Sequence, residues 1–446
     1  MLEKVRNAFK VKDIRKRLIY TFIVLIIVRI GSQLPIPGVS REFFQEWFSK
    51  QASALNFFNA MTGGSFTKMS IFALSITPYI TSSIIIQLLT IAIPKLEEMQ
   101  KDGEDGRKKI VEFTRYLTIG LSIIESAALA IGFGNQNLLE DGIGFTSVTV
   151  MIVSLTAGSA ILMWLGEQIT EKGIGNGISI ILMFNIVSGM PEDFGNLYET
   201  FVKGATGTTN GLIAAVIIIA IVLAMIVFII VLQDAIRKIP VQYAKKLQGR
   251  KMVGGQVSHI PLKVNTAGVI PVIFASSLLS LPIVISQFAG ISPASGKGAS
   301  FWQKVLKVCN QSDWCNFKNF GEFKYTLGLL VYIAMVIFFA YFYTNITFNP
   351  VEVSANLKKA GGFVPGIRPG KPTTDYLNNV LNKIIFIGAV GLTIIAVVPI
   401  FCSGAFKANI GFGGTSLIIV VGVVLETIKQ IESQMLVRNY KGFLND

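Results

Sequence analysis

The chain has 446 residues, of which 52% are hydrophobic and 15% are charged, and its formal net charge is +14. Soluble domains carry about 25% charged residues at a similar apolar content, so this composition excludes an ordinary soluble domain. Long apolar runs favour a membrane protein instead, because a helix needs roughly 20 apolar residues to cross a bilayer. In a membrane protein the position of the positive charge indicates which side of the membrane each connection occupies.

Ten apolar segments follow one another along the chain. A basic N-terminal stretch precedes the first and no small-residue cleavage site follows it, which differs from a cleavable signal peptide. The fifth segment, ISIILMFNIVSGM, is short, so that it either crosses the bilayer at a thinned point or lines a water-filled cavity. The predicted spans are residues 18–32, 71–93, 115–133, 148–168, 178–190, 212–232, 267–288, 326–345, 380–400 and 414–432.

Lysine and arginine are distributed unevenly among the connections between these spans. With the N-terminus placed in the cytoplasm, most of the 40 basic residues fall on the inner side; loop 234–266 is rich in them and loop 134–147 has none. This positive-inside pattern predicts that both termini are cytoplasmic. Loop 289–325 carries five lysines against the pattern, but long loops are weak topology signals.

The spans divide into two halves of five, residues 1–205 and residues 206–446, joined by VKGATGTTNG. An odd number of spans in each half places the halves in opposite orientations, an arrangement typical of transporters and channels. This prediction depends on the span count alone, because the halves show no convincing similarity in sequence.

The chain lacks the residue patterns of an enzyme or a metalloprotein. It has one histidine, His259, and three cysteines that do not cluster with other metal ligands. The phosphate-binding loop pattern is absent, because Lys371 in PGIRPGKP is followed by proline. We predict no catalytic residues, no metal and no cofactor, so a partner or a gradient must supply the energy for any large cargo. Cys309 and Cys315 either form a disulfide or remain two free thiols.

Ionisable residues are few within the predicted spans. An ion-coupled transporter keeps paired ionisable groups near the membrane midplane, because such groups are costly there and persist only for function. Glu125 is the deepest and has no evident basic partner, so we interpret it as facing a polar crevice between helices rather than as a proton carrier. The ionisable residues in the spans are Arg29, Glu125, Glu167, Glu426 and Lys429.

Four long segments stand out for their distinctive sequences: SIFALSITPYITSSIIIQLLTIAIP (70–94), LGEQITEKGIGNGISI (165–180), YAKKLQGRKMVGGQVSHIPLKVNTAGVIPVIFASS (243–277) and NLKKAGGFVPGIRPGKPTTDYL (356–377). Together they resemble the SecY family, the channel subunits of the bacterial protein translocase. The resemblance covers essentially the whole chain in order. It implies an all-α integral membrane fold of ten transmembrane helices, in two inverted five-helix halves that form an hourglass channel with a re-entrant plug. Ser75 departs from the family, which usually has glycine there, and loop 289–325 looks longer than expected.

The resemblance also implies a pore ring of apolar side chains at the narrowest point of the channel. Two pairs of these residues are four positions apart, which places both members of a pair on one face of a helix. An apolar constriction resists wetting by ions and fits varied chains without hydrogen-bonding to them. Composition alone would describe the same residues as core or lipid-facing. The predicted ring is Ile76, Ile80, Leu182, Ile186, Ile273 and Ile419.

The plug is expected within residues 55–70, where two glycines interrupt any helix. The alternative is a plain external loop, which its aromatic residues disfavour. The predicted plug residues are Phe57, Phe58, Asn59, Met61, Gly63, Gly64 and Phe66. The lateral gate is expected between spans two and three on one side and spans seven and eight on the other. Gln87 on span two is the candidate gate residue, although packing between helices would also explain a polar side chain there.

Loops 234–266 and 346–377 are implied to dock the motor ATPase SecA and the ribosome. Glycine and proline keep GGFVPGIRPGKP from forming a helix, and Arg368 within it matches an arginine on which the family depends. Arginine can pair bidentately with phosphate or carboxylate, although the positive-inside bias alone would also place basic residues here. The predicted partner-binding residues are Arg250, Lys251, Lys358, Lys359 and Arg368.

The leading interpretation is a passive protein-conducting channel in the bacterial cytoplasmic membrane. It would translocate unfolded secretory polypeptides and release membrane-protein helices laterally into the lipid. The expected partners are SecE, SecG, SecA, the ribosome, signal sequences and nascent or secretory polypeptides. An ion-coupled secondary transporter of a small solute is the alternative, and a membrane scaffold without transport is a third possibility.

Overall fold

A computed structural model gives the structure of the chain. It describes residues 9–39, 44, 59, 61–134, 144–198, 208–243, 246–248, 251–253, 257–288, 300–310, 314, 326–406 and 414–442. Within these ranges each of the ten predicted spans coincides with a long helix. These helices are α2 (Lys12–Gly31), α4 (Thr77–Ala92), α6 (Glu104–Gly134), α7 (Phe145–Lys172), α8 (Gly177–Tyr198), α9 (Thr208–Asp234), α10 (Ile270–Phe288), α12 (Leu327–Thr347), α14 (Lys371–Phe406) and α15 (Gly414–Gly442).

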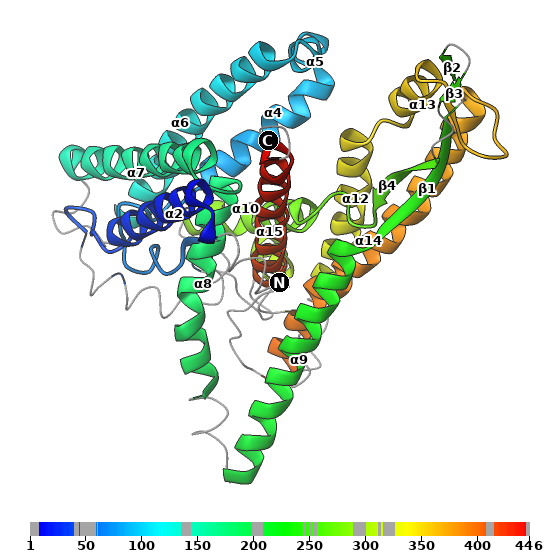
Figure 1. Cartoon of the computed structure of the whole chain (residues 1–446). Helices are drawn as coiled ribbons and strands as arrows, with labels where there is room; N and C mark the ends of the chain where they lie inside the picture. Colours follow the sequence, from blue (N-terminus) through cyan, green and yellow to red (C-terminus); the bar gives the residue numbers. More distant parts are fainter. Residues whose placement is uncertain are drawn as a thin grey trace.

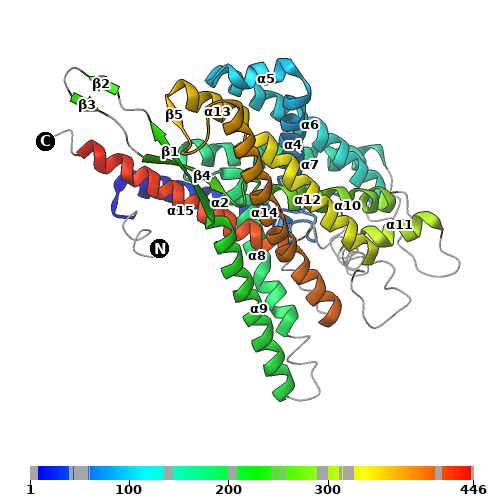
Figure 2. The same cartoon turned by 90° about the vertical axis from the view of Figure 1, so that its right-hand side faces the viewer.

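Shorter elements connect the long helices. Three short helices are α5 (Pro94–Lys101), α11 (Phe301–Cys309) and α13 (Pro350–Lys359). The strands are β1 (Ile236–Tyr243), β2 (Lys246–Gln248), β3 (Lys251–Val253), β4 (Val257–Lys263) and β5 (Gly362–Phe363). Figures 1 and 2 show α5 and α13 at one end of the molecule, whereas α8 finishes and α9 begins at the opposite end.

Several of the long helices are suited to cross a membrane by length and hydropathy. Among the described residues, four satisfy both criteria alone: α6, α7, α12 extended by α13, and most of α14. Helices α4 and α5 satisfy them together, as a pair bent by 103°. Many large apolar side chains also face outward, such as Phe22 on α2, which is 64% exposed. Apolar surface on this scale fits contact with lipid rather than water.

The second span begins later than predicted, and its end agrees with the prediction within one residue. Residues 71–76 form turns, and α4 begins only at Thr77 with Pro78 in its first turn. Ser75 has a φ of +52°, which a helix cannot contain, so the apolar run up to Ile76 is not helical. The helix ends before Pro94, because proline has no backbone N–H to donate to the preceding turn and its ring clashes with that turn. Pro94 then begins α5, which runs in a new direction.

A small sheet extends the fold beyond the predicted helices. Strand β1 pairs antiparallel with β4, from Ile236 opposite Lys263 to Gln242 opposite Val257, and β5 pairs with the other edge of β1. The strand alternates along its second half, with Ile239 and Val241 buried between exposed neighbours. These side chains pack with Leu357 of α13 and Leu377 of α14. The two loops at residues 234–266 and 346–377 therefore form one body.

The remaining apolar side chains gather where the helices meet. Helix α8 packs against α7 and α15, and α10 packs against α6 and α12. In Figure 1 the helices of residues 1–205 lie mostly on the left and those of residues 206–446 mostly on the right, with α10 and α15 between them. The α8–α15 and α10–α6 contacts thus join the first part of the chain to the second.

Candidate functional site

Six apolar side chains from four helical regions meet in the middle of the fold; we call them the central cluster. Ile76, Leu182, Ile186 and Ile419 are buried in one apolar core, and Ile80 and Ile273 pack against it half-buried. They are the residues predicted for the pore ring. The structure brings all six together although they lie far apart in the sequence, from Ile76 to Ile419.

Local structure positions the members of the central cluster. Leu182 and Ile186 are four residues apart on α8 and so share one face. Ile76 lies at the start of α4 rather than within the helix, and its carbonyl accepts a hydrogen bond from the Ile80 amide at 3.0 Å. This first helical turn keeps Ile76 and Ile80 on the same side of α4. The two isoleucines therefore share a face although Ile76 lies just before the first residue of the helix.

The predicted plug segment lies directly against the central cluster. Met61 is buried in the same apolar core, and Phe66 packs edge-on against Phe44 with ring centroids 5.8 Å apart. The Asn59 carbonyl accepts the Gly64 amide at 3.2 Å, and its side-chain oxygen accepts the Thr67 hydroxyl at 2.9 Å. Phe57 and Phe58 lie outside the described residues. Gly63 and Gly64 both have positive φ, at +62° and +80°, so they form turns as predicted for this segment.

Two polar residues contact the plug segment or the turn before α4, and neither was given a role from the sequence. Arg29 on α2 donates to the Gly63 carbonyl at 3.1 Å. Asn185 on α8 donates to the Ser75 hydroxyl at 3.2 Å. The only sequence signals were the presence of Arg29 in a span and the departure of Ser75 from glycine. Neither signal identifies the partner, because each contact joins residues distant in sequence.

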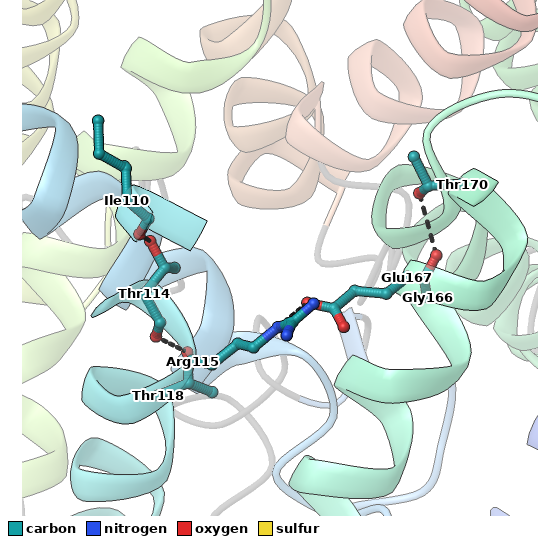
Figure 3. A network of polar contacts seen from close by, with 7 residues as sticks. All are labelled: Ile110, Thr114, Arg115, Thr118, Gly166, Glu167 and Thr170. Carbon is teal, nitrogen blue, oxygen red and sulfur yellow. Dashed lines mark hydrogen bonds and ion pairs between the residues drawn. The ribbon is translucent and has the colours of Figure 1, made fainter. Parts of the chain in front are cut away.

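An ion pair joins α6 to α7. Arg115 Nε and Glu167 Oε1 are 2.7 Å apart, with side chains 43% and 18% exposed (Figure 3). Around it, Thr114, Thr118 and Thr170 return their hydroxyls to carbonyls of their own helices. From the sequence, Glu167 was counted among the few ionisable residues of the spans, and no partner was assigned to it. A second pair, Lys429–Asp234 at 2.6 Å, joins α15 to the end of α9.

The predicted gate residue Gln87 is exposed on α4. The helices on either side of the expected gate are in contact, since α4 packs against α6, α6 against α10, and α10 against α12. Glu125, which we interpreted as facing a polar crevice, is half-buried on α6. The two helix pairs are therefore in contact through α6 and α10, and Gln87 lies on the surface of α4.

Basic residues collect on the body formed by the sheet and α13; we call Lys358, Lys359 and Arg368 the basic surface. All three are exposed, and the two lysines lie in the last turn of α13, where the helix dipole favours positive charge. Gly366 and Gly370 have positive φ on either side of Arg368, whose carbonyl accepts the Thr373 hydroxyl at 2.9 Å. Arg250 lies outside the described residues, and Lys251 is described only as part of β3.

Titratable groups outside the spans offer no metal site among the described residues, since no group of three or more His, Cys, Asp or Glu side chains comes together there. On α5 the Glu97 carboxylate accepts a hydrogen bond from Lys101 at 2.6 Å and raises the pKa of that lysine. Burial raises the pKa of the Cys309 thiol, which is free. Cys315 lies outside the described residues, so its pairing stays untested.

The long apolar helices and the outward-facing apolar side chains define a helical membrane protein, and comparison with known proteins gives its family. The SecY family model matches residues 70–428. The chain is 44% identical to the protein translocase subunit SecY of Halalkalibacterium halodurans and 43% identical to that of Streptomyces scabiei, over the full length of each. It therefore belongs to the SecY family. It is a multi-pass membrane protein and a protein-conducting channel subunit rather than an enzyme.

Solved structures show the same fold at lower sequence identity. A SecY structure concerned with the plug domain matches with a TM-score of 0.61 at 17% identity, covering 95% of this chain and 92% of the other. Sec61 in a canine ribosome–channel complex matches with a TM-score of 0.53 at 15% identity, covering 95% and 93%. The predicted membrane fold is confirmed by these likenesses, and the sheet of β1, β4 and β5 adds to the predicted helices.

We predict that Arg115 and Glu167 stabilise the protein as a pair. Removing one partner leaves the other partly buried and unpaired, so Arg115→Ala and Glu167→Ala together should cost less than the sum of the two single changes. The expected coupling is about 1 kcal/mol in the free energy of unfolding, at the upper end for pairs that are not fully buried. Denaturant unfolding of the detergent-solubilised protein measures it.

The control is the pair Lys108–Asp105, which is 3.8 Å apart with both side chains largely exposed. The same cycle there should give a coupling close to zero. A coupling for Arg115–Glu167 no larger than that of the control would contradict the prediction.

Proposed function

We propose that unfolded polypeptides cross the membrane through the central cluster, which forms the pore ring. The observation that carries this proposal is the meeting of six predicted residues from four helical regions in one apolar core. Aliphatic side chains close around varied sequences without hydrogen-bonding to them, and a narrow apolar constriction resists wetting by ions. Met61 in the same core supports the assignment of residues 55–70 as the plug that rests on this ring.

The lateral gate in this proposal opens between α4 and α6 on one side and α10 and α12 on the other. The contact between α6 and α10 would have to part for a signal sequence or a membrane helix to reach lipid. Gln87, exposed on α4, would meet such a helix as it leaves. A polar side chain facing lipid is costly, which supports a role in the opening.

The basic surface is the proposed docking site for SecA or the ribosome, which would supply the driving force. Solved likenesses include Sec61 in a canine ribosome–channel complex and a yeast Ssh1 complex bound to the 80S ribosome. Arg368 is exposed between two turn glycines, where its guanidinium can meet a partner's carboxylate or phosphate. The turn and sheet hold this arginine in place, because β5 pairs with β1 just before it.

The proposed setting is the bacterial cytoplasmic membrane, with both termini in the cytoplasm and with SecE and SecG as further subunits. Helices α5 and α13 and the sheet share one end of the molecule, which agrees with assigning their loops to one side by charge (Figure 1). The halves 1–205 and 206–446 would then face each other across the pore. The acidic partner of each ion pair lies near a helix end, since Glu167 is in the last two turns of α7 and Asp234 is the last residue of α9, which is unlike the midplane site of an ion-coupled transporter.

Replacing Ile80 and Ile186 by glycine should make the resting channel leak ions. Both side chains would vanish from the central cluster, so the constriction widens and wets. Conductance of the purified complex in planar bilayers measures the leak. The control is Ile181→Gly, a buried residue of α8 in the same core but outside the proposed ring, which carries the helix cost of one glycine, about 1 kcal/mol, against two glycines in the ring variant.

A resting conductance at the parent level in the Ile80→Gly, Ile186→Gly variant would show that the ring is assigned wrongly. A leak of equal size from Ile181→Gly would show that loosening the core, and not opening a ring, lets ions through.

Charge reversal at Arg368 should leave the protein folded and inserted but impair export driven by SecA. A lost charge-assisted contact at an interface typically costs about 2 kcal/mol or more, so transport into vesicles should slow at least about tenfold. Arg107→Glu is the matched control, an exposed arginine near the start of α6 outside the basic surface. Equal transport rates for Arg368→Glu and the parent would contradict the docking proposal and indicate that residues 361–372 only link two helices.

A further inference from the structure

The turn before α4 is held in a conformation that its sequence resists. Ser75 is 1% exposed and has a φ of +52°. This value lies in the left-handed region, which strains most residues other than glycine. Its amide donates to the Phe72 carbonyl at 2.9 Å. Helix α7 encloses the turn from one side, because Gly158 lies against the Ile71 carbonyl so closely that a side chain there would collide. Glycine at position 75 would avoid this strain. The serine hydroxyl makes a contact that can offset it.

That contact is with Asn185. Its side chain is 4% exposed, and its Nδ2 donates to the Ser75 hydroxyl at 3.2 Å. Asn185 lies on α8 directly before Ile186 and three residues after Leu182, and Ser75 directly precedes Ile76. The hydrogen bond therefore joins two of the segments that contribute residues to the proposed ring, α8 and the turn before α4. It does so next to the ring residues themselves.

The backbone of Asn185 receives the plug segment. The α-carbon of Gly63 approaches so closely that a Cβ there would stand 2.4 Å from the Asn185 carbonyl oxygen. The Gly63 carbonyl in turn accepts the Arg29 guanidinium at 3.1 Å, so α2 holds the same residue from its other side. Gly63 has a φ of +62°, which glycine adopts without strain. Only glycine combines this turn with the close approach to α8.

We propose that Asn185 is a positioning residue that couples the seating of the plug to the closure of the ring. Its side chain holds the turn before α4 through Ser75, and its carbonyl receives Gly63, which Arg29 fixes in place; we call these four residues the latch. When α8 moves away from α4, the Ser75–Asn185 hydrogen bond breaks and the surface that seats Gly63 leaves with it. Opening of the ring and release of the plug then occur together.

This inference rests on the proposed pore ring and plug, and it predicts an effect that packing alone does not. Ser75→Gly removes the hydrogen bond but also relieves the strained φ, so the fold should be no less stable while the closed state is weakened. A purely structural serine would change stability and leave the resting channel closed. Stability and resting conductance therefore separate the two roles.

The test measures ion conductance of the purified, reconstituted complex in planar bilayers, with thermal unfolding of the same samples. Loss of one hydrogen bond should raise the resting open probability about fivefold in Ser75→Gly and in Asn185→Ala. The double variant should rise no further, because the two residues share one bond. The control is Ser82→Ala on α4, a buried serine whose hydroxyl donates to the Pro78 carbonyl of its own helix, and it should stay closed.

Crosslinking adds a second readout, between a cysteine placed at Thr62 and one placed at Ser188 on α8. The crosslink should weaken in Ser75→Gly, since the plug leaves its seat as the ring loosens. Two outcomes contradict the latch: conductance at the parent level in both single variants while Ile80→Gly, Ile186→Gly leaks, or a double variant equal to the product of the singles. If the ring variant does not leak either, the pore ring is wrong and the latch is wrong with it.

Discussion

The burial of aliphatic side chains from separate helices against one another, with no polar partner among them, is the constraint on which the rest of the structure depends. Four helical regions contribute side chains to the central cluster. Each helix must therefore be placed so that its isoleucine or leucine reaches the centre of the fold. Such contacts are strong together and individually unspecific, since burial depends on area rather than direction. The central cluster therefore holds its four helical regions together without depending on any one directed contact.

Polar contacts set where this apolar closure sits. Ser75, Asn185, Gly63 and Arg29 link the turn before α4, α8, the plug segment and α2 around the central cluster. Away from it, Arg115–Glu167 joins α6 to α7 and Lys429–Asp234 joins α9 to α15. Hydrogen bonds are directional and the apolar contacts are not, so the few polar links give the helices one register while the apolar core supplies most of the stabilisation.

The sequence predicted the helices well because their apolar runs are long. The six residues of the central cluster were predicted from the resemblance to the SecY family, since composition alone would describe them as core or lipid-facing. The sequence placed the start of the second span too early, since an apolar run does not reveal the positive φ of Ser75. The alternation around Ile239 and Val241 was a strand signal that was available but not used. The contacts of Arg29 and Asn185 were beyond reach, because they depend on how distant segments approach in three dimensions.

The most direct test of the central claim is where a translocating chain lies. A photoreactive residue placed in turn at Ile76, Ile186 and Ile273 should crosslink to a secretory polypeptide stalled part-way across the membrane. Leu392, buried in the separate core between α9, α10 and α14, should not crosslink. Crosslinks at all three positions of the central cluster are the predicted result. Crosslinking at Leu392 with none at the central cluster would contradict the account.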